Sequence, residues 1–285
     1  MSFAKTTITR PPLRYHGGKF RIARHILPFL PESGCYVEPF GGAAGVLLQR
    51  KPSRIEVYND LDSEVVELFR ILRDQEQSEV LRHQIELTPF SREEFYRCWT
   101  PAEDPIERAR RMIVRSFQAI GTKKRREKNG WRTRTPKAVW SPCHAWRGWP
   151  EFMHEYVDRL RNVIIEHVPW QQCVGIYDHS DTVFFVDPPY PKGTRSMGWD
   201  RDVYNHEMTD EDHEDHEELC RRLVTCSGMV ALSTYPNEIY PAILKGWKLV
   251  EIKARAQTNA PRVEELWLNP AIVDRHQPEL FGGAG

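Results

Sequence analysis

Four features that each define a class of protein are missing from this sequence. Its apolar runs stop well short of the roughly 18 residues that a membrane helix needs, and the first 15 residues contain no apolar signal-peptide core. The 6 cysteines are scattered without a CxxC pair, which indicates neither a zinc ribbon nor a disulfide framework. Charge of one sign is also not in excess, because 40 basic and 40 acidic residues cancel. We therefore expect a cytoplasmic protein with reduced cysteines and no membrane partner, whose attraction to any polyanion is local.

The order of apolar and polar segments predicts an α/β protein with an insertion. Residues 1–72 contain two successive units of apolar strand, polar or glycine turn and helically spaced segment, which predict a parallel sheet. The pattern resumes at residue 159 and ends in "WKLVEIKARA" and "VEELWLNP", which we expect to form an antiparallel hairpin at the sheet edge. Residues 73–158 do not follow this alternation of strand and helix segments. The sequence thus predicts a Rossmann-like domain formed by 1–72 and 159–285, interrupted by a mostly helical and irregular insertion at 73–158.

The stretch "FFVDPPYP" marks a candidate site in the second half of the chain. Residues 183–186 are apolar and mostly β-branched or aromatic, as in a buried strand, and Asp187 follows at its carboxyl end. Open α/β sheets bind ligands at that edge. The alternative is a strand that ends in a proline turn with a solvated aspartate.

A glycine-rich turn in "VEPFGG" marks a second candidate site, directly after the first strand. Gly41, Gly42 and Gly45 allow a tight turn and close approach of the backbone to a ligand. The next strand ends in Asp60, 19 positions after Gly41, which matches the spacing of about 20 at which an acid binds ribose hydroxyls. The alternative is a turn glycine followed by an aspartate that caps a helix. With no P-loop signature present, these features favour an adenosyl ligand such as S-adenosylmethionine.

Four motifs in order give the chain a family resemblance. "RYHGGK", "EPFGG", "YNDLD" and "DPPY", with a basic insertion before the last, resemble the Dam-type (α-group) adenine DNA methyltransferases, and most closely their phage and prophage relatives. "YNHEMTDEDH" and "EELWLNP" also resemble the phage-type members. The resemblance implies a site-specific enzyme that transfers a methyl group from S-adenosylmethionine to the exocyclic amine of adenine in double-stranded DNA, in a restriction-modification, phage or regulatory setting.

The chemistry of that amine explains the DPPY motif. Its lone pair is delocalised into the ring, so two acceptors, the Asp187 carboxylate and the Pro188 carbonyl, would hold the nitrogen toward tetrahedral geometry. Pro188 and Pro189 supply rigidity, and Tyr190 would stack on a base flipped out of the duplex. The resemblance gives as catalytic residues Asp187, Pro188, Pro189 and Tyr190, and as cofactor-binding residues Tyr15, Lys19, Glu38, Phe40, Gly41, Asp60 and Asp187.

One departure from the family concerns the cofactor's adenine. Many relatives carry an acid in the strand or turn before DPPY, and the comparable place here is Pro169. Trp170 would then replace that contact by stacking.

A local basic segment is the candidate DNA-binding surface. Between Gly121 and Arg147 nine lysines and arginines face one acid, Glu127. Phosphate contacts there would make binding salt-dependent. Alternatively the charges form a solvated face, and the interleaved tryptophans hold the insertion together. The expected DNA-binding residues are Arg14, Lys123, Lys124, Arg125, Arg126, Trp131, Arg132 and Arg134.

The histidine-acid cluster around His213 and His216 suggests a metal site, but we expect a solvated helix and no metal, because methyl transfer needs none. Alternatives for the function are methylation of cytosine's exocyclic amine or of RNA, and a DNA-binding module with a decayed site. The recognition sequence and the oligomeric state are left open.

Overall fold

One mixed sheet forms the centre of the protein. The computed structural model describes residues 8–121, 130–133, 141–191, 208, 214–255 and 261–280. The sheet has seven strands in the order β3-β2-β1-β4-β5-β7-β6, and the first five are parallel, as in the doubly wound Rossmann order. The predicted α/β class is therefore confirmed. The strands are β1 Cys35–Glu38, β2 Ile55–Asn59, β3 Val163–Glu166, β4 Thr182–Val186, β5 Met229–Thr234, β6 Lys248–Arg255 and β7 Pro261–Leu268.

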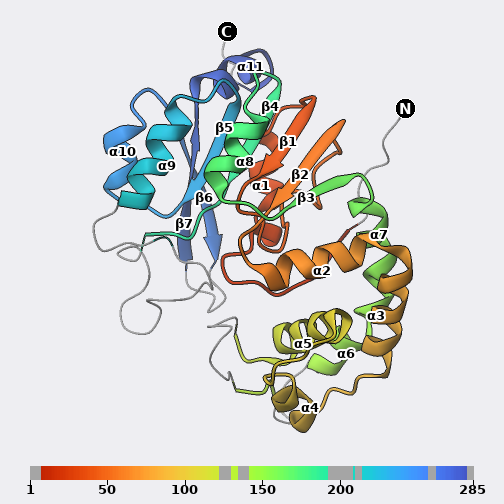
Figure 1. The fold of residues 1–285 in the computed structure, drawn as a ribbon. Coiled ribbons are helices and arrows are strands. Elements are labelled where there is room, and N and C mark those ends of the chain that lie inside the picture. Colours follow the sequence, from red (N-terminus) through yellow and green to blue (C-terminus); the bar gives the residue numbers. More distant parts are fainter. Residues whose placement is uncertain are drawn as a thin grey trace.

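Helices cover both faces of this sheet (Figure 1). Successive strand residues point to opposite faces, so Val37 and Phe184 join one hydrophobic cluster while Tyr36 and Phe185 join the other. Because both faces are covered, every residue of β4 is buried, which explains why the apolar run "TVFFV" shows no alternation. The first cluster packs against α8 Trp170–Tyr177, α9 Glu214–Val224 and α10 Ile239–Ile243; the second packs against α1 Ala23–Ile26, α2 Ser63–Arg73, α7 Met153–Leu160 and α11 Pro270–Leu280.

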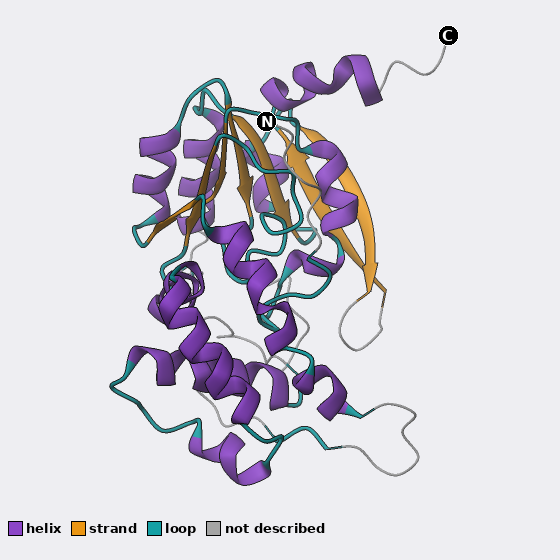
Figure 2. Cartoon of the chain, turned by 90° about the vertical axis from the view of Figure 1, so that its right-hand side faces the viewer, coloured by secondary structure: helices purple, strands orange, loops and turns teal. Residues whose placement is uncertain are grey.

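The described residues between α2 and α7 form a helical layer beyond the carboxyl ends of the parallel strands (Figures 1 and 2). Its buried side chains belong to the same hydrophobic cluster as those of α2, so its core is continuous with that of the sheet. Trp146 and Trp149 are buried in it, and their indole nitrogens donate to the carbonyls of Thr88 and Pro12 at 2.8 and 3.0 Å. The α-helices of this layer are α3 Gln75–Leu87, α4 Arg92–Arg97, α5 Pro105–Gln118 and α6 Pro142–Arg147.

Of the first predicted strand-turn-helix unit, the strand and the turn are confirmed, but the helix is not formed. Residues 42–50 after β1 form consecutive turns and no helix. The N–H groups of Leu48 and Arg50 bond to carbonyls four residues earlier, but these bonds do not continue into a helix, and the Leu47 N–H donates to the Glu38 carboxylate at 2.7 Å. Ala44 also has a φ of 51°, which a right-handed helix does not allow.

The predicted hairpin of β6 and β7 is confirmed, with β7 also pairing antiparallel to β5. All six cysteines are free. Within the described residues no helix is both long and apolar enough to cross a membrane. The final residues, 281–285, lie outside the described part of the chain.

Candidate active site

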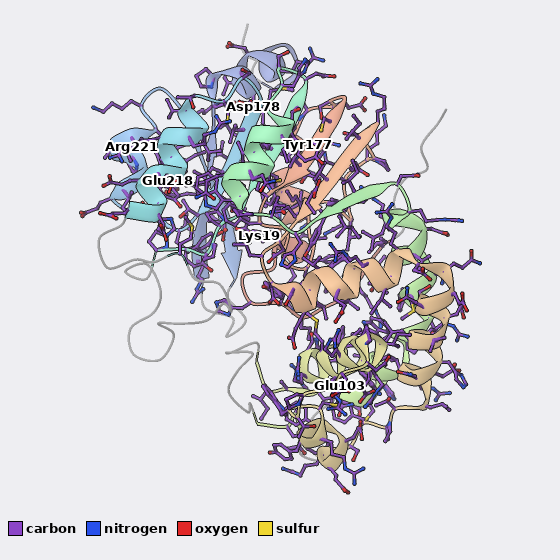
Figure 3. All side chains as sticks on the ribbon, in the orientation of Figure 1. Lys19, Glu103, Tyr177, Asp178, Glu218 and Arg221 are labelled. Carbon is purple, nitrogen blue, oxygen red and sulfur yellow. The ribbon has the colours of Figure 1, made fainter. Side chains whose placement is uncertain are left out.

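A pocket lies at the carboxyl ends of β1, β2 and β4, where several separate stretches of sequence meet. Lys19 lies in the short 3-10 helix Lys19–Arg21, and Figure 3 shows it at the end of the sheet that faces the helical layer. All seven residues that were expected to bind the cofactor line this pocket. Its walls include Tyr15, His16, Lys19, Glu38, Phe40, Gly41, Asp60, Leu61, Asp62, Trp170, Gln171, Asp187, Pro189, Met208 and Asp215.

The glycine turn is shaped by close contacts with its neighbours. A Cβ atom on Gly41 would lie 2.2 Å from the Tyr58 ring, so no larger residue fits there without displacing that ring. Gly42 has a φ of 48°, in the left-handed region that favours glycine. The Gly41 N–H donates to the Asn59 carbonyl at 2.7 Å, which ties the turn to the end of β2. The backbone therefore passes close to the pocket at this point.

Asp60 fixes the same turn from the other side. Its carboxylate accepts the N–H of Gly42 at 2.7 Å and that of Asp62 at 2.8 Å. It does not cap the following helix, because the N-cap of α2 is Asp62, which accepts the N–H of Glu64. The alternative that Asp60 is a helix cap is therefore wrong, and its carboxylate borders the pocket instead.

The first motif and DPPY are joined by an ion pair. The Lys19 ammonium lies 2.7 Å from Asp187 Oδ1 and 3.3 Å from Glu264 Oε1, and it donates to the Gly17 carbonyl at 2.8 Å. The Lys19 side chain is 6% exposed and that of Asp187 17%. One lysine thus lies between two largely buried carboxyl groups.

Burial shifts the pKa values of two acids of the pocket. It raises the pKa of Asp187 to about 6, against the lowering effect of Lys19 and with a further raising effect from Glu264. It raises the pKa of Glu38 to about 8, although the Tyr36 hydroxyl and the Leu47 N–H both donate to Glu38 Oε1 at 2.7 Å. Between these two pKa values the pocket therefore holds an ionised Asp187 beside a Glu38 that still carries its proton.

Tyr190 lies behind the pocket wall and is 4% exposed. Its hydroxyl donates to Glu264 and lies 3.1 Å from Ser233 Oγ, and its ring contacts the Tyr235 ring edge-on at a centroid distance of 4.5 Å. The Lys19 ammonium lies 4.7 Å from the centre of the Tyr190 ring. Pro189 lines the pocket, and Pro188 lies in the chain between the pocket residues Asp187 and Pro189.

Two aromatic rings line the pocket beside the glycine turn. Phe40 and Trp170 have ring centroids 6.3 Å apart, at 33° to each other. Trp170 is the first residue of α8 and follows Pro169, at the place where the resemblance predicts an acid. The Asn59 side chain holds this segment by bonding to both backbone groups of Val168 at 3.0 Å.

Three of the expected DNA-binding residues are described, and each contacts residues of the helical layer. The Arg14 guanidinium lies 5.2 Å from the Phe117 ring centre, and Arg132 Nε donates to the Ala119 carbonyl at 2.9 Å. Trp131 packs beside Phe90, with a ring-centroid distance of 5.4 Å. The other five expected residues, Lys123, Lys124, Arg125, Arg126 and Arg134, lie outside the described residues.

Glu264 is the site residue that sequence reasoning missed. It lies in "RVEELWL", a strand whose two adjacent acids point to opposite faces, and it is 4% exposed. The signal available in the sequence was an acid on the inward face of an apolar strand, since such an acid needs a partner when it is buried.

The histidine-acid cluster of α9 takes a structural part where it is described. His216 is 1% exposed and its Nδ1 lies 2.8 Å from the Tyr240 hydroxyl. No group of three or more potential metal ligands occurs in the described residues. His213 lies outside them.

Comparisons with known proteins agree with the motifs. A family model described as D12 class N6 adenine-specific DNA methyltransferase matches residues 15–258. DNA adenine methylases of Salmonella typhi and Salmonella typhimurium are each 35% identical over 106 residues, 34% of this chain and 36% of theirs. The modification methylase StsI of Streptococcus sanguinis is 33% identical over 67 residues, 23% of this chain and 10% of its own. The aligned part of the chain thus spans about a third or less of these relatives.

Among solved structures, a conserved hypothetical protein of Streptococcus pyogenes matches 88% of this chain and 94% of its own, with a TM-score of 0.32 and 10% identity.

Proposed function

Because the chain belongs to the D12 class N6 adenine-specific DNA methyltransferases, we propose that it transfers a methyl group from S-adenosylmethionine to the exocyclic amine of adenine in double-stranded DNA. The observation that carries the proposal is the convergence of Asp187 with the glycine turn and Asp60 in one pocket. In open α/β sheets this edge is where ligands bind.

The chemistry of the pocket fits this cofactor. Five carboxyl groups and one lysine line it, and even with Glu38 protonated the acids outnumber the lysine, so its charge suits a ligand with a positive sulfonium centre. Phe40 and Trp170 offer flat apolar surface for an adenine ring, and the close-packed Gly41 turn brings the backbone to the ligand. Asp60 would hold the ribose hydroxyls, and Tyr15, Lys19 and Glu38 would border the amino acid part. When bound, the cofactor supplies an electrophilic methyl group.

Asp187 and Pro188 would act directly on the substrate base. Each would accept one N–H of the adenine amine, Asp187 with its carboxylate and Pro188 with its carbonyl. Accepting both hydrogens concentrates the lone pair on nitrogen and directs it out of the ring plane. Pro189 would keep the chain rigid at this point, and Tyr190 would stack on the flipped base.

DNA would lie across the side of the molecule that carries the helical layer. Residues 73–158 would form the target-recognition insertion, with the basic segment around Lys123 to Arg126 and Arg132 to Arg134 contacting phosphates. Arg14 would contribute from the pocket side. An enzyme acting on DNA within a bacterial or phage-infected cell would work in the cytoplasm, without a resident metal.

The test of the proposal is methyl transfer by the wild type, Asp187→Ala and Asp158→Asn. Asp158 is a matched control because its carboxylate is 72% exposed on α7, where it lies 3.8 Å from Arg161. We expect Asp187→Ala to lose at least about a hundredfold in rate while binding DNA as the wild type does, because one acceptor in the transition state is removed. We expect Asp158→Asn to match the wild type.

Other outcomes point to the alternatives. Methyl label found in cytosine or in RNA would mean that the substrate is cytosine or RNA and not adenine in DNA. Equal rates for Asp187→Ala and the wild type would show that Asp187 takes no part in the reaction. A folded wild type that binds DNA without transferring any methyl group would indicate a binding module with a decayed site.

A further inference from the structure

The buried carboxylate of Glu264 joins two parts of the active site that are distant in sequence. It lies on β7, and its Oε1 atom accepts the Ser233 hydroxyl at 2.9 Å and the Tyr190 hydroxyl. The same oxygen lies 3.3 Å from the Lys19 ammonium. One oxygen atom therefore meets the first motif, DPPY and the end of β5.

Burying an acid in this way costs free energy unless the surrounding donors compensate for the loss of hydration. An apolar residue in β7 would fill the same space without that cost, as Leu266 and Leu268 do on the same strand. The three donors that meet Glu264 come from the residues around the reaction centre. The arrangement thus favours a role in the site over a role in folding alone.

We propose that Glu264 is a positioning residue for methyl transfer, which holds Lys19 and Tyr190 so that the Asp187 carboxylate stays available to the substrate amine. The inference rests on the proposed function. It gives β7, which pairs antiparallel to β5, a part in a reaction whose acceptor Asp187 follows the parallel strand β4.

The charges around Asp187 explain why a carboxylate is needed at position 264. Lys19 lies between Asp187 and Glu264, so the three groups together carry one negative charge when all are ionised. As the methyl group passes from sulfur to the substrate nitrogen and S-adenosylhomocysteine leaves, the nitrogen would gain a positive charge that this residual negative charge stabilises until the extra N–H proton passes to solvent. If Glu264 were neutral, Lys19 would be balanced by Asp187 alone, and Asp187 would be a weaker acceptor.

The same charges set the direction of a pH effect. Among the described residues, Lys19, Tyr190 and Glu264 act on the pKa of Asp187, and Asp187 in turn raises the pKa of Glu38. A negative charge on Glu264 raises the pKa of Asp187. Removing that charge lowers the pKa. The acid limb of the pH-rate profile would then move to lower pH, while a purely structural loss would leave the limb in place.

The test compares Glu264→Gln with Glu265→Gln. Glu265 is the adjacent residue on β7, is similarly buried, and accepts the Trp267 indole N–H at 3.1 Å on the other face. We expect Glu264→Gln to lower kcat about tenfold, to leave the KM for DNA within about twofold, and to shift the acid limb to lower pH. Glu265→Gln should keep the wild-type kcat and limb.

Two results would overturn the inference. One is an unchanged acid limb in Glu264→Gln, and the other is an equal loss of kcat in both variants. If Glu264→Gln does not fold, Ser233→Ala removes one donor to the same oxygen and should lower kcat, and an unchanged kcat in that variant would also overturn the inference. An inactive wild type would instead contradict the proposed function, so the two failures are distinguishable.

Discussion

At the residue scale, Asp187 combines burial with a cationic partner. Burial opposes its ionisation, whereas Lys19 at 2.7 Å favours it. The outcome is a pKa of about 6, raised from the ordinary range but still below neutral pH. In the proposed reaction Asp187 must be ionised to accept a hydrogen bond, and this pKa leaves it ionised at neutral pH and titratable within an accessible pH range.

This balance predicts the pH dependence of the reaction. Because Asp187 must lose its proton to accept the amine N–H, kcat/KM should rise with pH and level off above an apparent pKa of about 6. Below that pKa, activity should fall about tenfold for each pH unit. Rates measured from about pH 5 to 8 at constant ionic strength would check it. A profile that is flat below the pKa would show that Asp187 is not the titrating acceptor.

How far the site could be predicted depends on the distance between its residues in sequence. Asp187, Gly41 and Asp60 stand within short motifs at strand ends, so local pattern and spacing were enough to bring them together. Glu264 stands 245 positions after Lys19 in the sequence. The pairing of β7 with β5 brings the two residues together in the fold. That pairing places β7 between β5 and β6 rather than at the sheet edge, and nothing in the local sequence specifies it.

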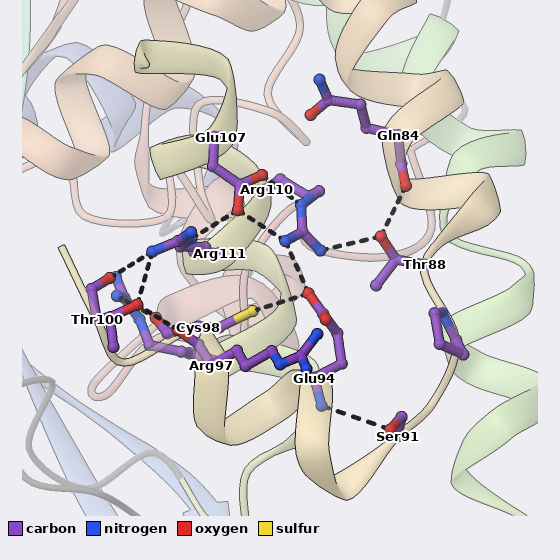
Figure 4. A network of polar contacts seen from close by, with 12 residues as sticks. Gln84, Thr88, Ser91, Glu94, Arg97, Cys98, Thr100, Glu107, Arg110 and Arg111 are labelled. Atoms are coloured by element: carbon purple, nitrogen blue, oxygen red, sulfur yellow. Dashed lines mark hydrogen bonds and ion pairs between the residues drawn. The ribbon is translucent and has the colours of Figure 1, made fainter. Parts of the chain in front are cut away.

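At the element scale, the helical layer is joined by a network of arginines and glutamates between α4 and α5 (Figure 4). Arg110 lies at its centre, 2.6 Å from Glu107 and 2.7 Å from Glu94, and it donates to the Thr88 hydroxyl at 3.1 Å. The Arg110 side chain is 13% exposed, and hydrogen bonds from Arg110 lower the pKa of Glu107. Such a partly buried pair is costly to break from one side.

Arg110→Ala should therefore destabilise the protein by about 2 to 3 kcal/mol, because it leaves Glu94 and Glu107 without their main partner. Arg82 provides the matched control, since its pairs with Glu79 and Glu86 lie on the exposed surface of α3. Arg82→Ala should cost less than about 1 kcal/mol. Urea unfolding of both variants checks this, and equal losses of stability would contradict a special role for the network.

The elements themselves were mostly predictable, and the exception has a local cause. The apolar run at 182–186 and the hairpin segments carry strand composition, so their pairing into a sheet followed from the pattern. The segment after β1 has helical spacing but forms turns, because the backbone bends at Gly42 and Ala44, which both have positive φ, while the Glu38 carboxylate accepts the Leu47 N–H. A buried acid that bonds to the backbone is not visible in a hydrophobic pattern.

At the scale of the whole molecule, a neutral chain concentrates positive charge in one segment. Of the nine basic residues between Gly121 and Arg147, eight belong to the stretch that joins α5 to α6 and Arg147 ends α6, and these two helices lie on the same side of the sheet as the pocket. The core of the helical layer is continuous with that of α2, the helix that follows Asp60. DNA held by this segment would thus be anchored to the body that carries the site.

Neutralising Lys123, Lys124, Arg125 and Arg126 to glutamine should weaken DNA binding and flatten its salt dependence. The log-log slope should fall by about 0.9 for each phosphate that is no longer neutralised. A control variant changes four exposed basic residues that lie just before the amino ends of strands, away from the pocket. They are Lys51 and Arg54 before β2, Arg161 before β3 and Lys245 before β6. That control should keep the wild-type slope. Titrations with duplex DNA at several salt concentrations measure both, and equal slopes in all three proteins would place DNA elsewhere.

The most direct test of the central claim is the identity of the methylated base. The wild-type protein would be incubated with S-adenosylmethionine labelled in its methyl group and with unmethylated genomic DNA, and the nucleosides of the digested product would be separated by mass. The proposed function predicts that the label appears in N6-methyldeoxyadenosine alone. Label in a cytosine nucleoside, or none in DNA while the protein is folded and binds the cofactor, would contradict it.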